Sequence, residues 1–145
     1  MAGGRERTAA DARCPRLIGL GANVGSSIKR TVLLVEDEVT VRIIGSDALA
    51  DAGYDVLEAE SADEAIRLME VAGEVHVLFT DIRMPGSMDG LQLAALVHQR
   101  WPQVKILVTS GDTWPPRNRI PDHGRFLAKP YRLDALRHEV DGLFA

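Results

Sequence analysis

The sequence has a single cysteine, Cys14, among its 145 residues. An internal disulfide is therefore impossible, and such low cysteine content is typical of a reducing compartment. No apolar run approaches the roughly 18 residues that a membrane span needs. The short apolar stretch at residues 17–20 is interrupted by glycine and has no clear cleavage site for secretion. We therefore expect a cytoplasmic protein with no membrane partner.

Positive charge is scarce in most of the chain. Residues 31–145 carry eleven Lys/Arg against nineteen Asp/Glu, whereas residues 1–30 carry six against two. Because the longer segment is acidic, we expect no nucleic-acid partner for it. The four histidines lack the spacing of metal ligands and are interpreted as structural or surface residues.

Residues 1–29 lack a regular spacing of apolar residues and are rich in glycine, alanine, serine and arginine. This composition predicts a disordered N-terminal tail. The remaining chain, residues 30–145, is long enough for one domain with a hydrophobic core. It ends shortly after the last predicted helix, so we expect no DNA-binding output domain.

Continuous apolar runs after residue 30 predict buried strands. They lie at residues 31–35, 75–79, 104–108 and 126–128, and residues 54–59 alternate in the manner of an edge strand. Apolar residues at helical spacing follow every strand but the fourth. The predicted core faces are Val41, Ile44, Ala48, Leu49 and Ala52; Ala62, Ala65, Ile66 and Met69; Leu91, Ala94, Ala95 and His98 or its neighbour Val97; and Leu133, Leu136, Val140 and Leu143.

Three prolines, Pro115, Pro116 and Pro121, follow the fourth strand. Each proline inside a helix costs about 3 kcal/mol, so the sequence predicts one short turn there at most. Ser61 and Asp89 are predicted to cap the helices that follow them.

Strand and helix alternate along the chain, which predicts a parallel sheet with helices on both faces. Right-handed crossovers leave few topologies. We expect a five-stranded α/β fold of the doubly wound, flavodoxin-like type, with strand order 2-1-3-4-5 and a fourth helix that is short or irregular.

Polar residues stand at the carboxyl ends of four predicted strands: Glu36 and Asp37, Asp81, Thr109, and Lys129. In the order 2-1-3-4-5 these ends share the edge at which open α/β sheets bind ligands. Carboxylates from neighbouring strands, about 4.8 Å apart, repel one another unless a hard cation such as Mg²⁺ lies between them. With a lysine and a hydroxyl nearby, the set fits an aspartate nucleophile that attacks a phosphoryl group.

Each of these residues also has an ordinary structural explanation. Glu36 and Asp37 could lie at a helix N-terminus that the dipole favours. Asp81 could cap a loop, Thr109 could simply end a strand, and Lys129 could be a surface lysine. Four such residues at the strand ends of one sheet edge nevertheless favour a joint function.

Residues 31–144 resemble the receiver domain of bacterial two-component response regulators. Any one motif is weak, but together they are specific: Val35-Glu36-Asp37-Glu38, Asp81-Ile82-Arg83-Met84-Pro85, Met88-Asp89-Gly90, Thr109-Ser110-Gly111 and Lys129-Pro130.

The resemblance implies that Asp81 accepts a phosphoryl group from the phosphohistidine of a sensor histidine kinase or a histidine phosphotransfer protein. Thr109 would hydrogen-bond the phosphoryl group and Lys129 would pair with it. Phe126 matches the aromatic switch residue that responds to the movement of Thr109. Simple core packing is the other explanation of Phe126.

The resemblance also implies a Mg²⁺ cofactor at the acidic residues. Asp37 and Asp81 would bind the ion, Glu36 would bind it mostly through water, and the backbone carbonyl of Arg83 would be a further ligand. Arg83 and Gly111 stand where the family tunes the lifetime of the phosphoryl group.

Two departures from the family pattern are evident: Gly86-Ser87 lengthens the loop after Asp81 by one residue, and the segment after Thr109 is rich in proline. We expect a stand-alone phosphorylatable receiver that signals to an unknown downstream protein by contact, or acts as a phosphate sink for a hybrid kinase. The alternatives are an interaction module that needs no phosphorylation and a phosphatase, which would require a second acid where Arg83 stands. We therefore expect a phosphoacceptor rather than an enzyme.

Overall fold

The computed structural model describes residues 29–145, so all of the predicted tail except Lys29 lies outside the described residues. The elements are arranged along the chain in the order β1 (Thr31–Val35), α1 (Val39–Asp51), β2 (Asp55–Ala59), α2 (Ala62–Val71), β3 (Val77–Asp81), α3 (Gly90–Arg100), β4 (Lys105–Ser110), a 3₁₀ turn (Arg117–Arg119), β5 (Arg125–Ala128) and α4 (Leu133–Gly142).

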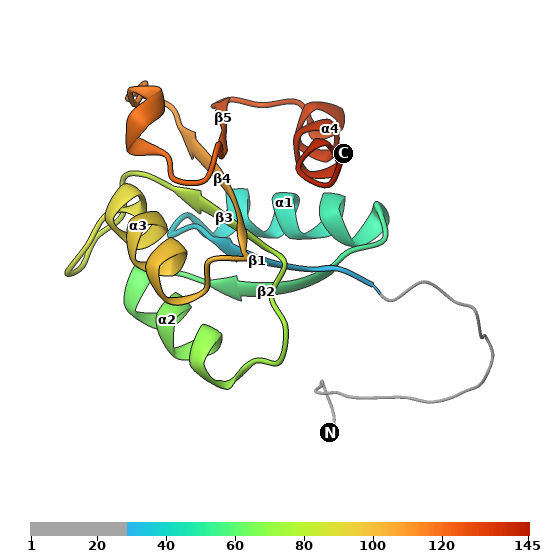
Figure 1. The fold of residues 1–145 in the computed structure, drawn as a ribbon. Coiled ribbons are helices and arrows are strands. Elements are labelled where there is room, and N and C mark those ends of the chain that lie inside the picture. The colour runs from blue at the N-terminus through green and yellow to red at the C-terminus, as the bar shows by residue number, and fades with distance from the viewer. Residues whose placement is uncertain (1–28) are drawn as a thin grey trace.

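The five strands form one parallel sheet in the order β2-β1-β3-β4-β5. Helices α1 and α4 lie over one face of the sheet and α2 and α3 over the other (Figure 1). The predicted topology and the predicted helices on both faces are confirmed.

The apolar strands separate two hydrophobic cores, one on each face. Alternate residues of β1 enter different cores: Leu33 packs in the core that includes α2 and α3, and Leu34 packs in the core that includes α1 and α4. Because a strand points successive side chains to opposite faces, a strand buried on both sides must be apolar at every position. The continuous apolar runs are therefore required by the two helical layers.

Two strands extend beyond the apolar runs that predicted them. β3 includes Thr80 and Asp81, and β4 includes Thr109 and Ser110. The register pairs Asp81 with Thr109. Backbone pairing does not require apolar side chains, so polar residues at the ends of these strands remain in the sheet. Asp81 is therefore held by the sheet and not by a free loop.

The predicted helix faces are partly wrong. In α3, Ala95 is exposed and Leu93 is fully buried. The five consecutive apolar residues at 93–97 give no polar contrast from which the buried face could be chosen. In α1, Ile44 is 47% exposed, and in α4 Leu133 is 47% exposed.

The segment between β4 and β5 contains a single 3₁₀ turn, Arg117–Arg119, as predicted from its prolines. The chain then passes through Asp122 and His123, which have φ values of 58° and 55°. This left-handed backbone makes the turn that leads into β5.

Both predicted caps are present. The Ser61 side chain accepts a hydrogen bond from the backbone N–H of Glu64 at the start of α2. Asp89 and Gln92 form a reciprocal capping box at the start of α3. These caps satisfy amide groups that the first turn of a helix leaves without partners.

The loop after β3 returns directly onto the end of that strand. Gly90, the first residue of α3, donates its backbone N–H to the carbonyl of Ile82 at 2.8 Å. A Cβ at this position would lie 2.9 Å from the Ile82 Cα and still closer to the Asp81 carbonyl. Glycine is therefore required by the close approach of two backbones beside Asp81.

The lengthened part of this loop is tied to a neighbouring helix. Gly86 has a φ of 111°, which favours glycine. Ser87 donates a hydrogen bond from its hydroxyl to the carboxylate of Asp63 in α2 at 2.8 Å. The extra residue thus adds a contact to α2 without displacing Asp81 from β3.

Candidate functional site

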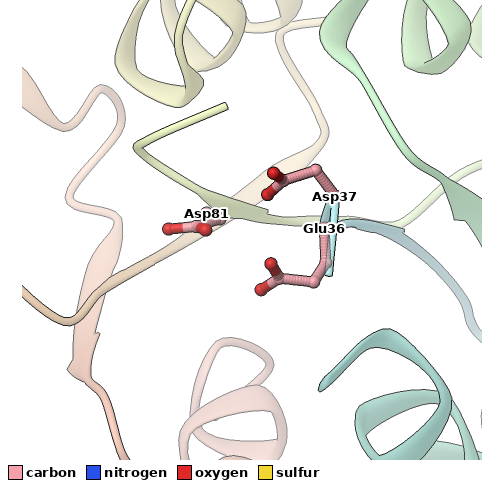
Figure 2. A group of neighbouring side chains, drawn as sticks. All are labelled: Glu36, Asp37 and Asp81. Carbon is pink, nitrogen blue, oxygen red and sulfur yellow. The ribbon is translucent and has the colours of Figure 1, made fainter. Parts of the chain in front are cut away.

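Three carboxylates meet at the carboxyl edge of the sheet. Glu36 and Asp37 directly succeed β1, and Asp81 ends the neighbouring strand β3. Each offers an oxygen within 4.8 Å of the others, and Figure 2 shows the side chains of Glu36 and Asp37 extending toward the side on which Asp81 lies. The strand order that the sequence predicts therefore brings together the three acids that it predicts.

These acids repel one another in a setting that water screens only partly. Glu36 is 2% exposed and Asp81 is 6% exposed, whereas Asp37 is only partly buried. Two unit charges at such distances repel by about 3–4 kcal/mol at an effective dielectric constant of 20. The cluster therefore needs positive charge.

Lys129 supplies part of that charge. Its Nζ donates to Oε1 of Glu36 at 2.7 Å and to Oδ2 of Asp81 at 3.1 Å. The lysine directly follows β5, and its backbone N–H donates to the Ser110 carbonyl at 2.9 Å. The sheet thus fixes the amine from one side and the carboxylates from the other.

Burial and these hydrogen bonds shift two pKa values. Burial raises the pKa of Glu36; the hydrogen bond from Lys129 offsets part of this effect, and the nearby charge of Asp81 adds to it. Burial acts to lower the pKa of Lys129, but the hydrogen bonds to Glu36 and Asp81 outweigh it, and the pKa is raised. The lysine is therefore firmly cationic at neutral pH.

Thr109 lies in β4 beside Asp81, as predicted, but its hydroxyl points to another partner. Its Oγ1 donates to the Leu127 carbonyl of β5 at 2.6 Å, and the residue is 2% exposed. The hydroxyl would have to leave this carbonyl to reach a group bound at Asp81.

Phe126 lies in β5 and packs, half-buried, against the core on the α2/α3 face. The Trp114 ring covers it, with ring centroids 5.0 Å apart and an interplanar angle of 54°. Trp114 itself is 75% exposed. Nothing in the sequence pattern predicted this pair, because the contact joins a loop to a strand without any periodic signal.

A pocket of about 420 Å³ opens above the carboxylates. Its lining includes Asp37, Asp81, Arg83, Gly111, Asp112 and Lys129. The structure therefore brings Arg83 and Gly111, both predicted to tune the site, to the mouth of the same pocket. Asp112 was not predicted; the Arg83 Nε donates to its Oδ2 at 2.8 Å.

Arg42 is a second residue that the sequence did not indicate. From α1, its Nη1 donates to the backbone carbonyl of Glu36 at 2.8 Å, and its Nε donates to Glu58 of β2 at 3.3 Å. The guanidinium thus ties the loop that carries two of the acids to the edge strand.

The residues at this edge fit a magnesium ion. Carboxylate oxygens are hard ligands, and Mg²⁺ prefers one or two carboxylates together with several waters. Three carboxylates lie within reach of one ion, and the open pocket above them has room for water. Together with such an ion, the Lys129 ammonium could offset the negative charge of an anionic group at this edge.

Comparison with known proteins agrees with this arrangement. The family model of the response regulator receiver domain matches residues 32–141. The chain therefore belongs to the response regulator receiver domain family of two-component and phosphorelay systems.

Several curated relatives are much longer proteins. The sensor kinase CckA of Brucella abortus is 41% identical in an alignment of 116 positions that covers 76% of this chain and 12% of the kinase. The cyclic di-GMP phosphodiesterase of Thermotoga maritima is 31% identical in an alignment of 113 positions that covers 76% of this chain and 30% of that protein. The chain thus spans less than a third of the length of either relative.

Solved receiver structures match most of the described domain. A response regulator receiver protein from Sinorhizobium medicae superposes with a TM-score of 0.73 at 28% identity, covering 79% of this chain and 94% of that chain. The receiver domain of the hybrid histidine kinase CckA gives a TM-score of 0.68 at 31% identity, covering 79% of this chain and 99% of that chain. Within residues 29–145, no helix is long and apolar enough to cross a membrane.

Proposed function

We propose that this protein accepts a phosphoryl group on Asp81 from the phosphohistidine of a sensor histidine kinase or a histidine phosphotransfer protein. It then signals by contact with a downstream protein. The observation that carries the proposal is the Lys129 amine, which lies within hydrogen-bonding distance of both Asp81 and Glu36.

In this reaction a carboxylate oxygen of Asp81 attacks phosphorus as the bond from phosphorus to the histidine nitrogen breaks. The electron pair of that bond remains on the imidazole, which then takes up a proton. Asp37 and Asp81 would hold Mg²⁺ directly, with Glu36 acting mostly through water and the Arg83 carbonyl as a further ligand. Bound Mg²⁺ would neutralise the negative charge that gathers on the phosphoryl oxygens.

Lys129 and Thr109 supply the remaining contacts. The Lys129 ammonium, now paired with two carboxylates, pairs with a phosphoryl oxygen instead. Thr109 turns from the Leu127 carbonyl toward the phosphoryl group, and the space that it leaves admits the Phe126 ring. The result is a change in the β4–β5 surface that a partner can detect.

A second candidate is a phosphate sink or relay intermediate for a hybrid kinase. It is favoured by the 41% identity to a sensor kinase and by the likeness to a hybrid-kinase receiver. The two candidates share the chemistry at Asp81 and differ in the later fate of the phosphoryl group. Return of that group to a histidine phosphotransfer protein distinguishes the sink from a receiver that signals by contact.

The proposal is tested with acetyl phosphate and Mg²⁺, followed by intact-protein mass spectrometry. We expect one phosphoryl adduct on the wild type, none on Asp81→Asn, and an unchanged adduct on the control Asp47→Asn, which alters an exposed acid of α1. Equal labelling of Asp81→Asn would contradict the proposal, as would a wild type that is never labelled by acetyl phosphate or by a phosphorylated histidine donor.

A further inference from the structure

The pocket at the sheet edge contains one ion pair that the proposed reaction does not use. Arg83, in the loop after β3, donates from its Nε to Oδ2 of Asp112, in the loop after β4, at 2.8 Å. Both residues line the pocket that contains Asp81 and Lys129. The pair therefore lies beside the group that would carry the phosphoryl modification.

The Asp112 carboxylate is positioned to hold the arginine in the unmodified protein. Its Oδ1 accepts hydrogen bonds from the hydroxyls of Ser110 and Thr113, each at 3.1 Å. The hydrogen bond from Arg83, and then those from the two hydroxyls, hold the pKa of Asp112 below its ordinary value. The group therefore stays a carboxylate throughout the neutral range.

The same pair is weak enough to be exchanged. The side chains of Arg83 and Asp112 are 71% and 54% exposed, and ion pairs in such surroundings contribute little. Within residues 29–145, the guanidinium makes its hydrogen bond through Nε, which leaves both terminal nitrogens for another acceptor. An arginine fork binds phosphate oxygens well in this way.

The charges in the pocket favour such an exchange. The Lys129 ammonium is already shared between two carboxylates. A phosphoryl group on Asp81 adds a charge of about −1.5 to −2 and three acceptor oxygens. Of the two cations that line the pocket, Arg83 can then gain more interaction energy than Lys129 by exchanging its exposed carboxylate partner for the phosphoryl oxygens.

We propose that Arg83 leaves Asp112 for the phosphoryl oxygens when Asp81 is modified, and that Asp112 is a positioning residue that competes with the phosphoryl group for this arginine. The inference rests on the proposed function, since it requires a phosphoryl group at Asp81. Asp112 thereby lowers the stability of the phosphorylated protein, because its negative charge holds Arg83 away from the phosphoryl group.

The test uses beryllofluoride with Mg²⁺, which binds an aspartate carboxylate as a phosphoryl mimic, measured by isothermal titration calorimetry. Asp112→Asn keeps one oxygen for the hydroxyls of Ser110 and Thr113, but it loses the charge and replaces the oxygen that accepts from Arg83 with an NH2 group. The backbone N–H groups of Asp112 and Thr113 remain bonded to the Ser110 hydroxyl, so the local turn is retained.

We expect Asp112→Asn to bind the mimic about two- to five-fold more tightly, the range available from an exposed ion pair. Arg83→Gln should bind it more weakly by a similar factor. In the Arg83→Gln background, Asp112→Asn should have no further effect on the affinity, because no guanidinium is left for Asp112 to hold. The NMR signal of the Arg83 Nε–H should shift when the mimic binds to the wild type.

Two results would overturn the inference alone. One is Asp81-dependent binding of the mimic with an affinity that Asp112→Asn leaves unchanged or weakens. The other is an effect of Asp112→Asn that persists in the Arg83→Gln background, which would show that Asp112 acts directly through its own charge. A wild type that fails to bind the mimic at all would overturn the proposed function, and this inference with it.

Discussion

At the scale of single residues, Arg42 shows how a side chain outside the acidic cluster can control it. Its guanidinium holds the backbone carbonyl of Glu36, in the peptide that joins Glu36 to Asp37, and the Arg42 side chain is only 17% exposed. A hydrogen bond from a charged donor in such a place is worth about 1.5–3 kcal/mol. The loop that carries Glu36 and Asp37 therefore depends on it.

Replacing Arg42 with glutamine should lower the affinity for Mg²⁺ by up to about ten-fold, by analogy with the loss of other groups that orient metal ligands. Calorimetric titration with Mg²⁺ measures the change. Glu58→Gln is the matched control, because it removes the other ion-pair partner of Arg42 and leaves the contact with Glu36 in place. Equal Mg²⁺ affinities in wild type and Arg42→Gln would show that the loop carrying Glu36 and Asp37 keeps its conformation without the Arg42 contact.

At the scale of elements, the close approach of α3 to β3 fixes the carboxyl end of the strand that carries Asp81. Gly90→Ala would place a methyl group against the backbone of Asp81 and Ile82. Backbone atoms cannot yield as a flexible side chain can, so we expect a loss of about 1–3 kcal/mol in the free energy of unfolding. Urea denaturation measures it, and labelling by acetyl phosphate should slow as Asp81 is displaced.

Gly73→Ala is the control for this change. A Cβ at Gly73 meets nothing within 4 Å, so the stability should stay within about 1 kcal/mol of wild type or rise slightly. A Gly90→Ala protein as stable as Gly73→Ala would mean that α3 can move away from the strand at no cost.

The sequence predicted the sheet, its strand order and the convergence of the site residues, and the reasons are physical. Strands buried on both faces must be apolar throughout, and the parallel order brings Glu36, Asp37, Asp81 and Lys129 to one edge. The apolar runs repeat along the chain, and the shared sheet edge results from the strand order. Both can therefore be predicted from the sequence alone.

The contacts that the sequence did not predict have no such regularity. Arg83 with Asp112, Trp114 with Phe126, and Arg42 with Glu36 join residues brought together only by the packing of loops and a helix. In α3, the choice between Ala95 and Leu93 for the core depended on how the helix rolls against the sheet. Such details are decided by tertiary packing rather than by local pattern.

At the scale of the whole molecule, both tyrosines connect parts of the fold that are far apart in sequence. The Tyr54 hydroxyl, in the turn after α1, donates to Asp141 of α4. The Tyr131 ring, between β5 and α4, packs against Phe79 of β3 at a centroid distance of 5.9 Å. Their protonation therefore reports on the layer formed by α1 and α4.

Burial raises the pKa of Tyr54 to about 12, with a further contribution from Asp141, and burial followed by the Glu36 charge raises that of Tyr131 to about 12. In the unfolded chain both phenols titrate near 10. Since the folded values are the higher ones, the stabilisation is complete below about pH 10 and is lost as pH rises toward 12. The free energy of unfolding in urea should therefore fall between about pH 10 and 12, and less so in Tyr54→Phe. The near-ultraviolet absorbance of phenolate should rise only as the pH approaches the value at which the protein unfolds. Ionisation of both tyrosines near pH 10 in a folded protein would contradict the prediction and would show that water reaches the α1/α4 layer.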